Sequence, residues 1–91
     1  MTAGMRYGFA YTPQSLAFLK TLQPKLRRQV ISRIQGLAAQ PTGPGSKKLQ
    51  GVTDGEYPVY RARHGKHRIL YSVRDMIIVV LDIDHRKDVY R

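Results

Sequence analysis

In the first segment of the chain, large apolar or aromatic residues occupy every second position. Every odd position from Met5 to Tyr11 is apolar or aromatic, and arginine, glycine or alanine lies between them. A period of two is typical of a β-strand that buries one face. We therefore predict a strand over residues 5–11.

A three-to-four-residue spacing of apolar positions follows. Thr12-Pro13 is a favourable helix start, because threonine caps a helix and proline suits its first turn. Leu16, Leu19 and Leu22 continue this first helix to Gln23-Pro24, where a second helix begins. The apolar stripe of the second helix consists of Leu26, Val30, Ile31, Ile34, Leu37 and Ala38. Pro41 closes it, so the two segments form a helical hairpin whose stripes must pack on a flat surface.

The remainder of the chain is expected to be a loop followed by three strands. Residues 41–46 have loop composition, residues 47–51 lead out of the loop, and residues 52–55 form a turn. Strands are predicted at 57–64, 67–73 and 76–83, the last apolar enough to be a central strand. The fold class is α+β, in the order β-α-α-β-β-β. A helical hairpin is packed on one face of a mainly antiparallel four-stranded sheet, and residues 1–91 form a single domain.

Charge is distributed unevenly. Sixteen Lys and Arg against six Asp and Glu give a net charge of +10. All six acids follow residue 53, whereas residues 1–53 carry eight bases and no acid. Such a balance favours a polyanionic or acidic partner. The bases of the second helix are either a solvated face or a contact for ribosomal RNA or an acidic partner: Lys25, Arg27, Arg28 and Arg33.

Other classes of protein are disfavoured. There is no cysteine, so neither a disulfide framework nor a thiolate zinc site is available. The three histidines lack a metal-ligand spacing, and neither a signal peptide nor a membrane span is recognisable. We expect a soluble cytoplasmic protein with no metal and no cofactor.

Strand parity predicts where the arginines point. Arg61 and Arg63 are two residues apart and share one face of their strand. Arg68 lies opposite in parity to Ile69 and Tyr71, which belong to the apolar face. If the apolar sets face the helices, the three arginines line the open face of the sheet. Guanidinium groups there suit the phosphates of RNA or DNA.

Three segments resemble the RelE/ParE superfamily of bacterial toxins from toxin–antitoxin pairs. They are Lys48-Leu49-Gln50-Gly51, the run from Tyr60-Arg61-Ala62-Arg63 to Tyr71, and the ending Asp84-His85-Arg86-Lys87-Asp88-Val89-Tyr90-Arg91. Their order over the predicted elements makes the resemblance cover nearly the whole chain. It implies the RelE-like microbial RNase-type fold.

The resemblance also implies one of two activities. RelE-like members cut messenger RNA in the ribosomal A site, whereas ParE-like members poison DNA gyrase. The implied catalytic positions are Arg61, Arg63, Arg68, Arg86 and Tyr90, and the neighbouring histidines His85 and His67 are candidate bases. The catalytic set we predict is Arg61, Arg63, Arg68, His85, Arg86 and Tyr90. The RNA-binding set is Lys47, Lys48, His64, Lys66, His67, Lys87 and Arg91.

One departure from the best-known cutting pattern leaves the proton acceptor open. That pattern has lysines on the first hairpin strand, and this chain has Arg61 and Arg63, which do not release a proton in proteins. The leading hypothesis is a metal-independent, ribosome-dependent endonuclease that binds messenger and ribosomal RNA. A cognate antitoxin would cover Arg61, Arg63, Arg68 and Arg86. A gyrase inhibitor without chemistry and a non-catalytic RNA-binding module are the alternatives.

Overall fold

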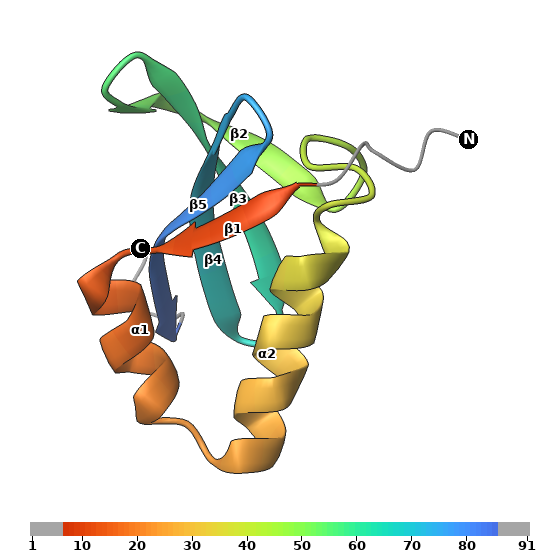
Figure 1. Cartoon of the computed structure of the whole chain (residues 1–91), viewed down its shortest axis with the longest axis vertical. Helices are drawn as coiled ribbons and strands as arrows, with labels where there is room; N and C mark the ends of the chain where they lie inside the picture. The colour runs from red at the N-terminus through yellow and green to blue at the C-terminus, as the bar shows by residue number, and fades with distance from the viewer. Residues whose placement is uncertain (1–6, 86–91) are drawn as a thin grey trace, which may run out of the picture.

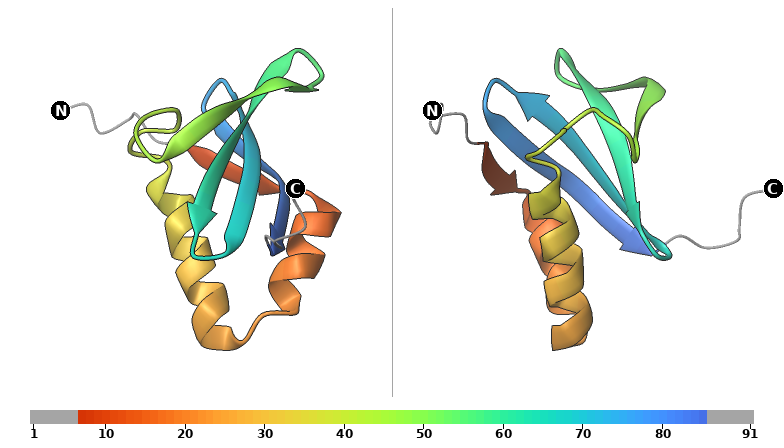
Figure 2. Two further views of the ribbon diagram at one scale, coloured as in Figure 1. Left: turned by 180° about the vertical axis from the view of Figure 1, so that it is seen from behind. Right: turned by 90° about the vertical axis from the view of Figure 1, so that its right-hand side faces the viewer.

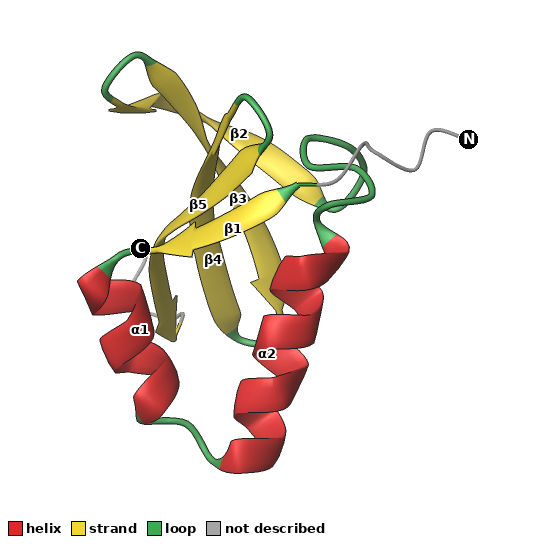
Figure 3. Ribbon diagram, viewed as in Figure 1, coloured by secondary structure: helices red, strands yellow, loops and turns green. Residues whose placement is uncertain are grey.

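The computed structural model describes residues 7–85, which form two helices and five strands. The elements in chain order are β1 (Gly8–Tyr11), α1 (Pro13–Lys20), α2 (Pro24–Gly36), β2 (Ser46–Asp54), β3 (Tyr57–His64), β4 (His67–Arg74) and β5 (Ile77–His85). The sheet order is β1-β5-β4-β3-β2, with β1 parallel to β5 and the other pairs antiparallel. Figure 1 and Figure 3 show the helices connected as a hairpin below the twisted sheet.

The predicted fold class is confirmed, and its strand count is corrected. Both helices lie on the same side of the sheet (Figure 2), and β5 is a central strand as expected. The sheet has five strands rather than four, because residues 46–54 are extended where we predicted a loop exit and a turn. This segment is an edge strand whose register shifts between Lys48 and Thr53 and whose residues are mostly exposed. An exposed, irregular edge has no buried face and therefore no alternation in sequence.

The start of α1 is fastened to the central strand. Thr12 is the N-cap, and its hydroxyl oxygen accepts from the Ser15 amide (3.2 Å) and donates to the Leu81 carbonyl (2.7 Å). The Thr12 amide donates to the Val80 carbonyl at 3.1 Å. A cap that also bonds to β5 holds α1 against the sheet while satisfying the helix terminus.

The junction of the helices depends on Arg27. Its Nε donates to the Leu19 carbonyl at 2.9 Å and its Nη2 to the Leu22 carbonyl at 3.0 Å. Carbonyls at a helix end lack intrahelical donors, so the guanidinium supplies partners and a favourable charge there. Arg27 is therefore a structural residue and is not part of a fully solvated helix face.

The core lies between the helices and the sheet. Its fully covered members are Leu19, Val30, Ile34, Leu37, Ala62, Ile69, Tyr71, Ile78, Val80 and Ile83. His67 is buried beside them on the helix side, where its ring meets Phe18 edge-on at 5.8 Å. Neither helix in the described residues is long and apolar enough to cross a membrane.

We predict that Ile34→Ala lowers the free energy of unfolding by about 2–5 kcal/mol, because it opens a cavity at a completely buried site. The control is Leu16→Ala, at a side chain that is 45% exposed, and its cost should stay below about 1 kcal/mol. Urea unfolding followed by circular dichroism measures both. Equal losses would contradict the assigned core.

A second prediction concerns acid stability. Burial lowers the pKa of His67, and the neighbouring His85 lowers it further. In the unfolded chain His67 binds a proton at about pH 6.5, whereas in the folded chain it does so only at a lower pH. The stability contributed by neutral His67 is present above pH 6.5 and is lost as the pH falls through the folded pKa. The slope is at most about 1.4 kcal/mol per pH unit.

The variant His67→Gln should flatten this loss between pH 7.5 and 5, measured by urea unfolding at several pH values. His64→Gln is the matched control, since it removes a less buried histidine from the same sheet face. It should retain most of the slope. An identical profile for wild type and His67→Gln would show that His67 does not contribute.

Candidate functional site

The register of β3 and β4 gathers three cations on the sheet face opposite the helices. Arg63 pairs directly with Arg68, and Arg61 pairs with Leu70. On the neighbouring strand β2, Lys47 pairs with Arg61 and so lies on the same face. Directly paired residues in a sheet share a face. We call Lys47, Arg61, Arg63 and Arg68 the arginine face.

Arg68 has a fixed orientation on this face. Its Nε lies 3.0 Å from Asp84 Oδ1 and its Nη2 lies 3.1 Å from Asp84 Oδ2, so the two groups form a paired, fork-like contact between β4 and β5. Such bidentate pairs hold the guanidinium plane in a defined direction. Asp84 also offsets part of the positive charge at this end of the face.

Arg61 and Arg63 line a hollow of about 370 Å³ with Arg33, Gly45, Ser46 and Lys47. Four of these six lining residues are cations and none is a carboxylate. Arg33 reaches the hollow from α2, because its Nε donates to the Arg63 carbonyl (3.0 Å) and its Nη2 to the Gly45 carbonyl (3.2 Å). The hollow is therefore a strongly electropositive concavity suited to phosphate oxygens.

Hydrogen bonds from Tyr71 hold the loop that precedes Lys47. The buried Tyr71 hydroxyl donates to the Pro41 carbonyl and hydrogen-bonds with Ser46 Oγ at 2.6 Å. Burial raises the pKa of Tyr71, so the phenol keeps the proton that it donates. Gly45 has a φ of +91°, and a Cβ there would lie 3.3 Å from Arg33 Nη2. Glycine is thus favoured both by the backbone and by the approaching guanidinium.

The histidines occupy the other face. His64, His67 and His85 pair across β3, β4 and β5, and the His67 and His85 rings meet at 5.2 Å. Contact with Phe18 fixes this row on the helix side. The structure therefore does not bring His67 onto the arginine face, because adjacent residues on a strand point in opposite directions. His85 is exposed where β5 ends.

The other predicted residues are scattered. Lys66 is exposed in the turn after His64, and Lys48 is exposed on β2 opposite Tyr60, away from the arginine face by parity. The predictions for Arg86, Lys87, Tyr90 and Arg91 lie outside the described residues. Within residues 7–85 no group of three or more histidine or carboxylate side chains is placed to hold a metal ion.

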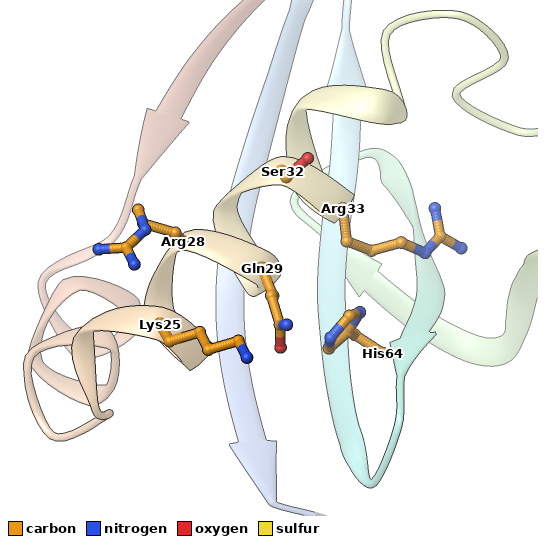
Figure 4. Close-up of a pocket in the computed structure, with 6 residues that line it drawn as sticks. All are labelled: Lys25, Arg28, Gln29, Ser32, Arg33 and His64. Carbon is orange, nitrogen blue, oxygen red and sulfur yellow. The ribbon is translucent and has the colours of Figure 1, made fainter.

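The bases of α2, which the sequence left as either a solvated face or a contact for RNA or an acidic partner, border a hollow. A second hollow, of about 820 Å³, lies between α2 and the end of β3 (Figure 4), and it is lined by Lys25, Arg28, Gln29, Ser32, Arg33 and His64. Arg33 lines this hollow and the one beside Arg61. The sequence signal for such a contact was the absence of acids before residue 54, which left the helical bases without partners on their own helix.

Known proteins resemble this chain in sequence and in fold. The chain is 32% identical over 90 residues to Toxin RelG of Mycobacterium tuberculosis, a match that covers 96% of this chain and 99% of that protein. The fold resembles the toxin in the archaeal RelE–RelB complex from Pyrococcus horikoshii, with a TM-score of 0.75 at 28% identity, covering 92% of this chain and 99% of that one. A chain in the toxin–antitoxin complex RelBE2 from Mycobacterium tuberculosis gives a TM-score of 0.76 at 28% identity, covering 93% and 97%.

One family of proteins matches nearly the whole chain. Residues 9–90 match the family described as the ParE toxin of the type II toxin–antitoxin system parDE. This range includes both helices, the four strands β2 to β5 and the arginines of the open face. The chain therefore belongs to the ParE toxin family, within the RelE/ParE superfamily, and is a RelE-like toxin of a toxin–antitoxin system.

Proposed function

We propose that this toxin is a metal-independent endoribonuclease that cuts messenger RNA in the ribosomal A site and so blocks translation in the cytoplasm. One observation carries the proposal: a hollow that contains Arg33, Lys47, Arg61 and Arg63 and no carboxylate adjoins the oriented guanidinium of Arg68. Charge of this density on a small fold suits a phosphodiester that gains negative charge during reaction.

The chemistry needs no cofactor. A ribose 2′-hydroxyl attacks the adjacent phosphorus, the bond from phosphorus to the 5′-oxygen breaks, and a 2′,3′-cyclic phosphate remains. The 2′-hydroxyl proton passes to a base, and the departing 5′-oxygen receives a proton from an acid. Arg61 and Arg63 would hold the non-bridging oxygens, and each well-placed donor in such a site contributes about 2.7–4 kcal/mol.

The base must come from another part of the site. His67 is directed toward the helices and packed on Phe18, so it is a structural residue in this proposal. His85 is exposed at the end of β5, one residue before Arg86, but it lies in the same row as His67, on the face opposite Arg61 and Arg63. The described residues therefore place no histidine on the arginine face, and His85 as the proton acceptor stays a prediction from the sequence. The roles of Arg86 in phosphate binding and of Tyr90 in stacking or orienting the nucleophile remain predictions from the resemblance.

A cognate antitoxin is the expected regulator. Two of the solved structures that resemble this chain are complexes described as RelE–RelB and RelBE2. We infer that the partner of this toxin lays acidic or apolar residues over the arginine face, which would neutralise it and exclude RNA.

Inhibition of DNA gyrase without cleavage is the second candidate, and the description of the matched family favours it. The cation-lined hollow favours the first candidate, because a purely steric inhibitor needs no concave phosphate site. The two candidates require different assays and can be separated in one experiment.

Arg61→Gln and Arg63→Gln should each lower messenger cleavage about 10²-fold, since each removes a donor to the reacting phosphate. Cleavage is measured by mapping messenger 5′ ends in a translation extract, and gyrase supercoiling is assayed in parallel. Lys20→Gln, an exposed lysine of α1 that lines neither hollow, is the matched control.

Ribosome-dependent breaks that disappear in the two arginine variants and persist in Lys20→Gln support the proposal. Trapped double-strand DNA breaks with intact messenger would support gyrase inhibition. Neither activity in folded wild-type protein would indicate a non-catalytic RNA-binding module.

Asp84→Asn should reduce kcat by about tenfold or more while leaving KM equal or lower. The amide cannot hold the Arg68 fork, but it also removes a negative charge that opposes RNA binding. Asp75→Asn is the control, because Asp75 is exposed in a turn at a φ of 54° that asparagine tolerates. A rise in KM with unchanged kcat would contradict a positioning role for Asp84.

A further inference from the structure

The hollow between α2 and β3 is separate from the arginine face. We call it the α2 hollow, and its lining consists of cations, an amide, a hydroxyl and an imidazole: Lys25, Arg28, Gln29, Ser32, Arg33 and His64. None of the described residues that line it is a carboxylate or an apolar residue. It lies on the helix side of the sheet, at the end of β3 where His64 pairs with His67.

The geometry of α2 produces this lining. Residues three and four apart on a helix share one face, so Lys25, Arg28 with Gln29, and Ser32 with Arg33 form three successive rungs. Figure 4 shows Lys25, Gln29 and His64 directed toward the same space, while Arg28 and Arg33 extend to its two sides. Each of these groups can donate hydrogen bonds.

The charge of this helix has no counterpart within the described residues. Their two ion pairs are Arg68–Asp84 and Arg74–Asp54, and neither involves α2. Lysine and arginine one turn apart repel each other, at a cost of a few tenths of a kcal/mol per pair. An anionic ligand would turn this repulsion into binding energy.

Arg33 connects the α2 hollow to the arginine face. It lines both hollows, and its bonds to the carbonyls of Arg63 and Gly45 hold it across the edge of β3. β2 begins at Ser46, opposite Ala62, so Arg63 and His64 extend beyond the part of β3 that β2 covers. A chain of phosphates can therefore pass from one hollow to the other beside a single guanidinium.

We propose that the α2 hollow is a second nucleic-acid-binding site, which holds phosphates of the single-stranded RNA whose neighbouring phosphates occupy the arginine face. A protein segment is a poorer fit, because peptide recognition relies on apolar anchors. The large exposed apolar residues in the described part of the chain are Leu16, Val52 and Ile77, and none of them lines the α2 hollow. This inference concerns binding and does not require that the RNA be cut.

The test uses a 12-nucleotide 2′-O-methyl RNA, which cannot be cleaved because it lacks a free 2′-hydroxyl. Its affinity for the purified toxin is measured by fluorescence anisotropy across a salt series. The plot of log K against log salt has a negative slope, and each phosphate contact that is lost should reduce its magnitude by about 0.7. We therefore expect one such step for Lys25→Gln and two for Lys25→Gln/Arg28→Gln. Lys20→Gln, a matched lysine on α1, should leave the slope unchanged.

A second readout locates the contact. The imidazole NMR signals of His64 should shift when the oligonucleotide is added to wild type, and the shift should be lost in the double variant. Equal effects of Lys20→Gln and Lys25→Gln on the slope would overturn the proposal, since they would reflect net charge alone. Displacement of the RNA from the α2 hollow by a 12-residue polyglutamate of equal or higher affinity would assign the hollow to an acidic protein segment.

The outcome is distinguishable from that of the proposed function. If wild type fails to cut messenger in the translation extract but the slope and His64 effects appear, the endonuclease proposal fails and the second site stands. If cleavage occurs and the slope is unaffected by the α2 variants, the second site is rejected and the endonuclease proposal stands.

Discussion

The two-residue turn at Gly65 and Lys66 sets the register of β3 against β4, and the chemistry of both faces follows from it. Gly65 has a φ of +60°, a conformation that suits the first position of such a hairpin turn. With this register Arg63 lies beside Arg68 and His64 lies beside His67. A slip of one residue would exchange the faces and place arginines in the core. The apolar contacts of Ile69 and Tyr71 in the core therefore also fix the face on which Arg61, Arg63 and Arg68 lie.

The ion pair between Asp84 and Arg68 makes the site more specific than its net charge suggests. Asp84 faces Arg68 across β4 and β5, whereas none of the described residues that line the hollow beside Arg61 and Arg63 is an acid. The face is thus divided into an oriented cation at one end and an acid-free concavity at the other. Such an arrangement can bind one phosphate strongly while directing a second group, which is what a reaction at a phosphodiester requires.

Sequence patterns predicted those parts of the molecule in which burial repeats regularly. The Thr12 cap, the two helices and the β3–β4 hairpin all depend on local spacing, and each formed where expected. Parity also predicted that Arg61, Arg63 and Arg68 share a face. β2 was missed because an irregular exposed edge strand leaves no period in the sequence.

Tertiary contacts explain the remaining differences. The sequence left Arg27 and Arg33 as either solvated bases or contacts for RNA or an acidic partner, but their guanidinium groups bond to carbonyls of α1, Arg63 and Gly45. His67 was a candidate base because it adjoins Arg68 in sequence, yet adjacency along a strand separates side chains onto opposite faces. Packing against Phe18 then buries it and favours its neutral form. Local sequence gave no indication of where these three side chains would find partners.

The uneven charge of the chain connects its stability with its partners. A net charge of +10 on 91 residues disfavours the compact state through self-repulsion, and the part before residue 54 has no acid to reduce it. Arg27 lessens this cost because its guanidinium bonds to the Leu19 and Leu22 carbonyls near the carboxyl end of α1, where a cation is favourable. Lys25 and Arg28 form no ion pair within the described residues, so their charge is retained at the expense of stability. Charged residues that destabilise a small domain and add nothing to its core are best explained by a role in binding. Both hollows are lined by cations, so the ligand class that suits both is a polyanion.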